Sequence, residues 1–242
     1  MILLGHRGLS ARFRENTLLA FVRAIEEGAD GVELDVRLCG SGELVVLHDA
    51  TLRRLWGDPR SAADLSLAEI RRVAPGIPTL ADAWEAVGGR GELHLEVKSD
   101  RIAFSPLAEP GAPWSRTAVA VAGWIRSGGL HRAPRGLVVS SFDPRILKVV
   151  ASAVPRVPCA LIFGGARRPP FPLRVAKGVG CRAVHPEARL VTDKVVRSAR
   201  RAKLAVRAWT VDEPKELRRL ARLGIDAVIS NDPTAARRAL SA

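Results

Sequence analysis

Apolar and polar residues alternate along residues 30–49, which read Asp-Gly-Val-Glu-Leu-Asp-Val-Arg-Leu-Cys-Gly-Ser-Gly-Glu-Leu-Val-Val-Leu-His-Asp. A period of two is typical of β-strands, and the glycine-rich segment 40–42 predicts a turn between strands at 30–39 and 43–49. This connection is far too short for a parallel crossover, so we expect an antiparallel hairpin.

Two acidic side chains and one imidazole interrupt this apolar ribbon. Glu33 and Asp35 share a face because strand side chains alternate, and opposed positions sum to about 82, which places His48 across from them. Buried carboxylates require a cation, and hard oxygen ligands suit Mg²⁺ or Ca²⁺, with the histidine close enough for proton transfer. The alternative is a surface hairpin with solvated acids, which the apolar residues between them disfavour.

Short apolar strands alternate with amphipathic helices along the rest of the chain. The expected strands span 2–5, 30–39, 93–99, 137–142, 159–163, 183–185, 204–210 and 227–230. The expected helices span 15–28, 66–73, 79–87, 115–127, 144–153, 171–177, 192–202 and 213–223. Residues 49–63 and 100–114 are expected to be irregular. Eight βα units within 242 residues predict an α/β fold, a (β/α)₈ TIM barrel with an extra antiparallel hairpin arm after strand two. The absence of a linker predicts one domain over residues 1–242.

Polar residues recur where the predicted strands end. In a (β/α)₈ barrel the functional groups lie at the carboxyl ends of the strands, so these residues should meet on one rim. They are His6, Arg7, Glu33, Asp35, Glu96, Lys98 and Trp209.

The formal net charge of +13 is compatible with a nucleic acid, a membrane surface or an acidic substrate as partner. The arginines are spread along the chain in pairs, so we expect no nucleic-acid partner. No apolar run approaches the roughly 20 residues of a membrane span, and a strand starts at Ile2 with no room for a signal peptide before it. Three cysteines at unrelated spacings suggest neither a disulfide framework nor a zinc site. We expect a cytoplasmic protein without stable membrane insertion.

Several short motifs occur in order along nearly the whole chain. They are His6-Arg7-Gly8, Glu15-Asn16-Thr17, Glu33-Leu34-Asp35-Val36, Val46-Leu47-His48-Asp49, Ile77-Pro78-Thr79-Leu80, Leu95-Glu96-Val97-Lys98, Ser140-Ser141-Phe142-Asp143 and Trp209-Thr210-Val211. With these motifs the chain resembles the glycerophosphodiester phosphodiesterase family. Its departures, such as Asn231 in place of a frequent aspartate and His94 in place of a frequent asparagine, remove no proposed ligand or proton carrier.

The resemblance implies hydrolysis of small-molecule glycerophosphodiesters to sn-glycerol 3-phosphate and an alcohol, with a divalent cation (Mg²⁺ or Ca²⁺). The implied metal ligands are Glu33, Asp35 and Glu96, and the implied acid–base pair is His6 and His48. Arg7, Glu15 and Lys98 would bind the phosphate and glycerol, and Trp209 would form an apolar wall.

Alternatives remain at this point. The same residues could serve a lysophospholipase D acting on lipids, or a non-catalytic barrel that binds anions. Lys98 and Arg7 could form ion pairs with the acidic residues instead of binding phosphate. His94 is interpreted as a core residue and Asp49 as a turn residue. For His185 the sequence favours neither a place at the border of the pocket nor one outside it.

The loops at 100–114 and 164–174 carry Phe104, Trp114 and Phe171. One hypothesis is that they hold a lipid-like diester at a membrane surface, and the alternative is that they are ordinary barrel loops.

Overall fold

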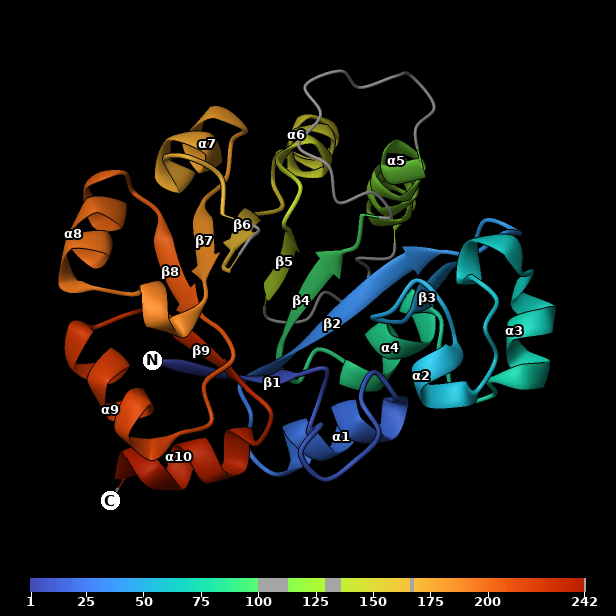
Figure 1. Ribbon diagram of the computed structural model, residues 1–242, viewed down its shortest axis with the longest axis horizontal. Helices are drawn as coiled ribbons and strands as arrows, with labels where there is room; N and C mark the ends of the chain where they lie inside the picture. Colours follow the sequence, from blue (N-terminus) through green and yellow to red (C-terminus); the bar gives the residue numbers. More distant parts are fainter. Residues whose placement is uncertain (100–112, 129–135, 166–167, 242) are drawn as a thin grey trace.

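The computed structural model describes residues 1–99, 113–128, 136–165 and 168–241, along which strands and helices alternate (Figure 1). The strands are β1 (Ile2–His6), β2 (Gly31–Leu38), β3 (Leu44–Val46), β4 (Glu92–Val97), β5 (Gly136–Ser141), β6 (Cys159–Phe163), β7 (Ala183–Pro186), β8 (Ala205–Ala208) and β9 (Ala227–Ser230). The α-helices are α1 (Leu18–Glu26), α2 (Arg53–Trp56), α3 (Leu67–Val73), α4 (Leu80–Val87), α5 (Pro113–Arg126), α6 (Pro144–Ala153), α7 (Pro172–Gly178), α8 (Asp193–Arg201), α9 (Pro214–Leu223) and α10 (Pro233–Ser241). Two 3₁₀ turns are η1 (Ala62–Asp64) and η2 (Ala188–Leu190).

Eight of these strands form a closed parallel barrel. Their order is β1-β9-β8-β7-β6-β5-β4-β2, and β1 pairs with β2 to complete the ring. Leu4, for example, pairs with Gly31 on one side and Ile229 on the other. The helices surround the ring (Figure 1). The predicted (β/α)₈ barrel is therefore confirmed.

The remaining strand, β3, forms the predicted hairpin outside the ring. It is antiparallel to the end of β2, with Val36 opposite Val46 and Leu38 opposite Leu44. The residue numbers of each pair add up to 82, which is the predicted register of the hairpin. β3 is shorter than expected, so His48 lies in the turn that follows the strand. The backbone N–H of Leu47 still donates to the carbonyl of Asp35, which keeps this segment beside β2.

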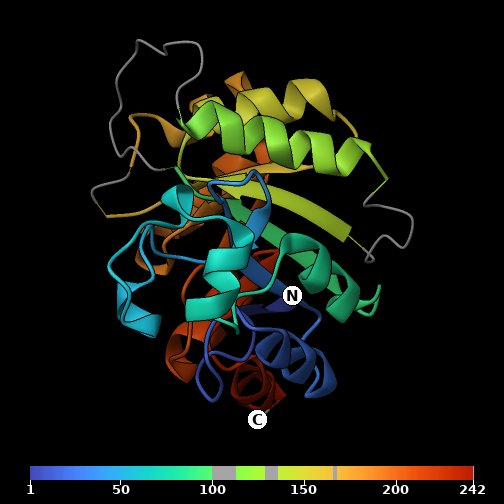
Figure 2. The same cartoon turned by 90° about the vertical axis from the view of Figure 1, so that its right-hand side faces the viewer.

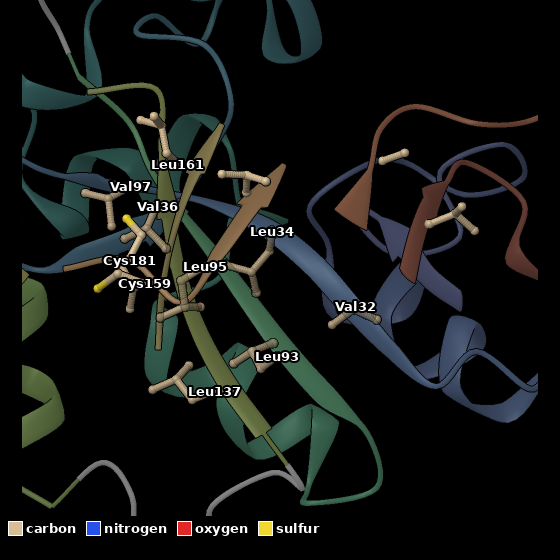
Figure 3. Packing of buried hydrophobic residues seen from close by; sticks show 14 of the residues in the cluster. Val32, Leu34, Val36, Leu93, Leu95, Val97, Leu137, Cys159, Leu161 and Cys181 are labelled. Carbon is tan, nitrogen blue, oxygen red and sulfur yellow. The ribbon is translucent and has the colours of Figure 1, made fainter. Parts of the chain in front are cut away.

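Alternation along β2 separates the hydrophobic core from the interior of the barrel. Val32, Leu34 and Val36 belong to the large cluster of buried hydrophobic residues that also includes core residues of the surrounding helices (Figure 3). Glu33 and Asp35 point to the opposite face, because successive strand residues face opposite sides. The pattern that buries the apolar side chains thus directs both acids to the interior.

Residues 49–78 cover one side of the hairpin and project from the barrel (Figures 1 and 2). Their apolar residues pack with Val45 and Leu47 in a second cluster. The prediction that 49–63 is irregular was wrong in part, because α2 lies within it and η1 begins in it. Each is at most four residues long, which is too short to produce a helical periodicity in the sequence.

Two further differences concern the end of the chain. α10 was not predicted, and its described buried residues, Pro233 and Ala236, give almost no apolar stripe. β8 ends at Ala208 and not at 210, so Trp209 lies just after the strand.

The expected loop at 100–114 falls largely outside the described residues, and Pro113 and Trp114 begin α5. No helix of the described chain is long and apolar enough to cross a bilayer.

Candidate active site

Three carboxylates converge on two neighbouring strands, from the middle of β2 and from the carboxyl end of β4. Asp35 pairs with Glu96 across the two strands, and Glu33 lies two residues earlier on the same face of β2. One oxygen from each of the three lies within 4.8 Å of the others, and all three side chains are buried. A cluster of buried hard oxygen donors suits Mg²⁺ or Ca²⁺, so the residues present fit the implied cation.

The pKa values of two of these acids move in opposite directions. Burial, together with the charges of Asp35 and Glu96, raises the pKa of Glu33 well above its ordinary value. Burial also opposes ionisation of Asp35, but Lys98 and Arg7 outweigh it and hold the pKa of Asp35 below its ordinary value. The positive charges of Lys98 and Arg7 thus do not compensate the burial of Glu33 and its acidic neighbours, as expected at a site that binds an additional cation.

His6 ends β1 beside Glu33, and its ring is oriented by Asn231. Nδ1 of His6 lies 2.7 Å from Oδ1 of Asn231. The amide of Asn231 is oriented in turn, because its Nδ2 donates to Asp212 at 2.7 Å. Oδ1 therefore faces His6 as an acceptor, His6 carries its proton on Nδ1, and Nε2 is left with a lone pair. Burial, together with the charge of Arg7, lowers the pKa of His6.

His48 has a different partner. Its Nδ1 lies 2.7 Å from Oδ1 of Asp49, and its backbone carbonyl accepts from the Nε and Nη2 atoms of Arg37 at 3.0 and 2.8 Å. Burial lowers the pKa of His48, while the negative charge of Asp35 opposes that change. His6 pairs with Glu33 across β1 and β2, and the backbone N–H of Leu47, the residue before His48, donates to the carbonyl of Asp35, so both histidines lie beside the acidic cluster.

Arg7 follows β1 in a left-handed conformation with φ of 55°. Its backbone N–H donates to Glu33 at 3.3 Å, and its guanidinium lies 2.8 Å from Glu15 and 3.2 Å from Asp35. The next residue is Gly8, where an added Cβ would lie 2.6 Å from backbone of α1. Glycine is therefore required for this loop to pack on the helix.

Lys98 lies one residue beyond β4, and its Nζ is 2.8 Å from Asp35 and also contacts Glu96. Burial opposes its protonation, but Asp35 and Glu96 outweigh that effect and raise the pKa of Lys98. Lys98 and Arg7 thus form ion pairs with the acidic residues. The sequence had left this arrangement open as the alternative to phosphate binding.

Trp209, which the sequence predicts as an apolar wall, packs against a second aromatic ring. The indole of Trp209 packs edge-on against Phe142 with ring centroids 5.6 Å apart. Its Nε1 donates to the backbone carbonyl of His185 at 2.8 Å. The two aromatic rings come from the ends of β5 and β8.

A family model described as the glycerophosphoryl diester phosphodiesterase family matches residues 6–235. The chain belongs to this family. It is therefore a phosphoric diester hydrolase, and the resemblance inferred from the motifs is confirmed.

Individual relatives of this family agree with that assignment. A glycerophosphodiester phosphodiesterase of Caldanaerobacter subterraneus is 28% identical over 244 residues, which cover 96% of this chain and 94% of the relative. The crystal structure of the Thermotoga maritima glycerophosphodiester phosphodiesterase is 29% identical with a TM-score of 0.81, covering 98% and 97% of the two chains. An Oleispira antarctica phosphodiesterase, solved in complex with the product sn-glycerol-3-phosphate, has the same fold with a TM-score of 0.85, 24% identity and coverage of 100% and 97%.

Four residues around the family's site were missed as site residues from the sequence. Asp49 and Asn231 hold the two histidines, Arg37 binds the carbonyl of His48, and Asn16 donates to Asp35 at 2.7 Å. Asn16 has φ of 57° and a buried amide, which marks it as part of a strained, specific turn. The turn assignment of Asp49 was incomplete, because its carboxylate also contacts His48.

Two other histidines, His94 and His185, are buried in the barrel, and His94 lies opposite Glu33 in the register of β2 and β4. His94 is fully buried and its Nε2 lies 3.0 Å from Glu92, as expected for a core histidine. His185 is stacked on it with ring centroids 5.8 Å apart. Neither ring nitrogen of His185 has a hydrogen-bond partner among the residues described.

Proposed function

We propose that the protein hydrolyses glycerophosphodiesters to sn-glycerol 3-phosphate and an alcohol, with a divalent cation held by Glu33, Asp35 and Glu96. The observation that carries this proposal is the buried triad of carboxylates with His6 and His48 on the neighbouring segments beside it. The product named in the Oleispira antarctica complex, sn-glycerol-3-phosphate, supports the same substrate class.

The charge of the site supports a requirement for the cation. Three carboxylates against two cationic side chains, Lys98 and Arg7, leave one negative charge when all are ionised. A diester anion would be repelled by that charge. A divalent cation would reverse it to one positive charge, and it would stabilise the negative charge that develops on the phosphoryl oxygens. Mg²⁺ and Ca²⁺ both fit an oxygen donor set.

His6 and His48 are proposed to move the protons. Phosphodiester cleavage requires one group to deprotonate the attacking hydroxyl and another to protonate the leaving alkoxide. Because each Nδ1 is engaged by an acceptor, Nε2 is the atom of each ring that exchanges a proton with substrate. The carboxylate of Asp49 stabilises an imidazolium better than the neutral amide of Asn231 does. The ring that acts first as general acid must start as an imidazolium, which the carboxylate of Asp49 favours at His48. We therefore assign His6, whose Nε2 carries a lone pair, as the first general base and His48 as the first general acid.

The remaining residues would bind and orient the substrate. The guanidinium of Arg7 is held by Glu15, which Arg54 also contacts at 2.6 Å. From that position Arg7 can bind the phosphate together with Lys98. The half-buried indole of Trp209 offers an apolar surface to the glycerol or to the alcohol.

The experiment measures release of glycerol 3-phosphate from glycerophosphocholine and glycerophosphoethanolamine, with Mg²⁺, Ca²⁺ or a chelator. His48→Ala and Glu33→Ala should each reduce turnover by at least about 10²-fold. Glu85→Ala, which removes an exposed glutamate of α4, should have no effect.

Other outcomes separate the alternatives. Turnover of lysophospholipids without turnover of the soluble diesters would identify a lysophospholipase D. Binding of glycerol 3-phosphate without turnover of either class would identify a non-catalytic anion-binding barrel.

A further inference from the structure

An apolar groove of about 620 Å³ lies between α7 and α8, outside the proposed active site. Its apolar lining includes Phe163 at the end of β6, Leu173 of α7, Leu190 of η2 and Val195 of α8. The two helices are neighbours on the outside of the barrel (Figure 1). None of the proposed catalytic, metal-binding or substrate-binding residues lines this α7–α8 groove. The groove is therefore a second surface that the proposed reaction does not explain.

Phe171 at the edge of the groove is unusually exposed. Its side chain is 71% exposed, more than any other large hydrophobic residue among those described. It precedes α7 with φ of 52°, a conformation that residues with a Cβ adopt rarely. An aromatic ring presented to water in this way contributes little to the core, and it is typical of a contact surface for an apolar partner.

The groove is also strongly basic. Arg168, Arg174 and Lys194 line it, and no acidic residue does. Within the described chain none of these three forms an ion pair, and the guanidinium of Arg174 instead lies 5.9 Å from the ring of Phe171. Three cations without acidic partners, placed around an apolar channel, complement a partner that is both anionic and apolar.

We propose that the α7–α8 groove docks the protein onto the surface of an anionic phospholipid bilayer. Phe171 would insert among the acyl chains at the interface, and Arg168, Arg174 and Lys194 would pair with headgroup phosphates. A nucleic acid would satisfy the cations but would leave the apolar lining unused. The formal charge of +13 adds long-range attraction to the same surface.

The docked orientation follows from the topology of the barrel. The groove starts where β6 ends, and parallel barrel strands all end on one rim, which also bears Glu96 and Lys98. Docking through Phe171 would bring this rim close to the bilayer. This docking would be independent of the proposed reaction.

The experiment measures binding of the full chain to phosphatidylcholine vesicles with and without phosphatidylglycerol, by co-sedimentation. The test variants are Phe171→Ser and the triple variant Arg168→Ser/Arg174→Ser/Lys194→Ser. The matched controls are Leu19→Ser, which removes a 57% exposed leucine of α1, and Arg71→Ser/Arg72→Ser/Arg126→Ser, which removes three exposed cations elsewhere.

We expect the wild type to bind vesicles that contain phosphatidylglycerol and both test variants to bind at least about tenfold more weakly, with the controls close to wild type. An unchanged circular dichroism spectrum would establish that Phe171→Ser is folded. The proposed docking is overturned if the wild type does not bind anionic vesicles. It is likewise overturned if the control Arg71→Ser/Arg72→Ser/Arg126→Ser loses as much binding as the groove variant Arg168→Ser/Arg174→Ser/Lys194→Ser. It is also overturned if Phe171→Ser binds these vesicles normally, or if the groove variants lose affinity for duplex DNA but not for vesicles.

Discussion

His48 donates from Nδ1 to the carboxylate of Asp49, its neighbour in the chain, over 2.7 Å. Nε of Arg54 lies 2.5 Å from the carboxylate of Asp49. Arg54 also forms an ion pair with Glu15, and Glu15 in turn pairs with Arg7. His6 makes the equivalent contact to Asn231, a neutral amide, also at 2.7 Å. The two imidazoles therefore have the same tautomer but different electrostatic support.

Replacing Asp49 with asparagine should impair the enzyme without removing a group that contacts substrate. The amide can present its NH₂ to Nδ1 and favour the wrong tautomer of His48, so kcat should fall by about 10²-fold while KM changes little. Steady-state kinetics on glycerophosphocholine measures this. Asp64→Asn, an exposed aspartate of η1, is the matched control. Equal kcat values for the two variants would show that Asp49 does not position His48.

Replacing Asn231 with aspartate tests the other histidine through its pH dependence. Burial and Arg7 lower the pKa of His6 in the wild type. A carboxylate in place of the amide would stabilise the protonated ring and raise that pKa, so the limb of the kcat/KM profile that reports His6 should move to higher pH. Asn231→Ala should lower kcat without this displacement. A profile that stays in place, or moves to lower pH, would contradict the assignment of Asn231 as the partner of His6.

Glu33→Gln should separate stability from metal binding. Because burial and the neighbouring acids raise the pKa of Glu33, its charge is unfavourable in the metal-free fold. We expect the variant to be more stable than the wild type by roughly 1 kcal/mol in chelator, and to lose the stabilisation that Mg²⁺ or Ca²⁺ gives the wild type. Thermal unfolding with and without each cation measures both effects. Cation-dependent stabilisation of the variant equal to that of the wild type would exclude Glu33 as a ligand.

The interior histidines should make stability depend on pH. Burial lowers the pKa of His94 to about 4 and that of His185 well below its ordinary value. An unfolded histidine binds a proton below about 6.5, so the unfolded state holds more protons between pH 6.5 and 4, and stability falls as pH falls.

His185→Phe should reduce that slope by up to about 1.4 kcal/mol per pH unit, since it removes one titrating group and two buried ring nitrogens that have no hydrogen-bond partner among the described residues. Urea unfolding at pH 7.5, 6.0 and about 5 compares the variant with the wild type. If the free energy of unfolding changes with pH equally in the two proteins, His185 is protonated in the folded state as readily as in the unfolded one.

The resemblance and the local pattern were sufficient to predict the cluster of Glu33, Asp35 and Glu96. Glu33 and Asp35 could be placed on one face because strands have a period of two, and the short turn sets the hairpin register that brings His48 opposite them. Neither inference requires a contact between distant parts of the chain. Both rely on rules that hold within about 20 residues.

The partners of these residues could not be predicted in the same way. His6 meets Asn231 across 225 positions, a pairing that exists because β1 closes the barrel between β2 and β9. Asn16 reaches Asp35 through the path of a loop whose conformation depends on left-handed backbone at Arg7 and Asn16. Side-chain direction in irregular segments has no sequence period from which it can be read.

By itself, then, the sequence determined the alternation of strands and helices, the hairpin and the set of acids and histidines, because each follows from local periodicity, turn length or a family motif. Tertiary structure decided which groups orient the two imidazoles, that Lys98 and Arg7 lie on the carboxylates, and that α7 and α8 leave an apolar groove lined by cations. The physical reason is barrel closure and helix packing, which bring together side chains that are far apart in the chain, and their charges then set the pKa values of the site.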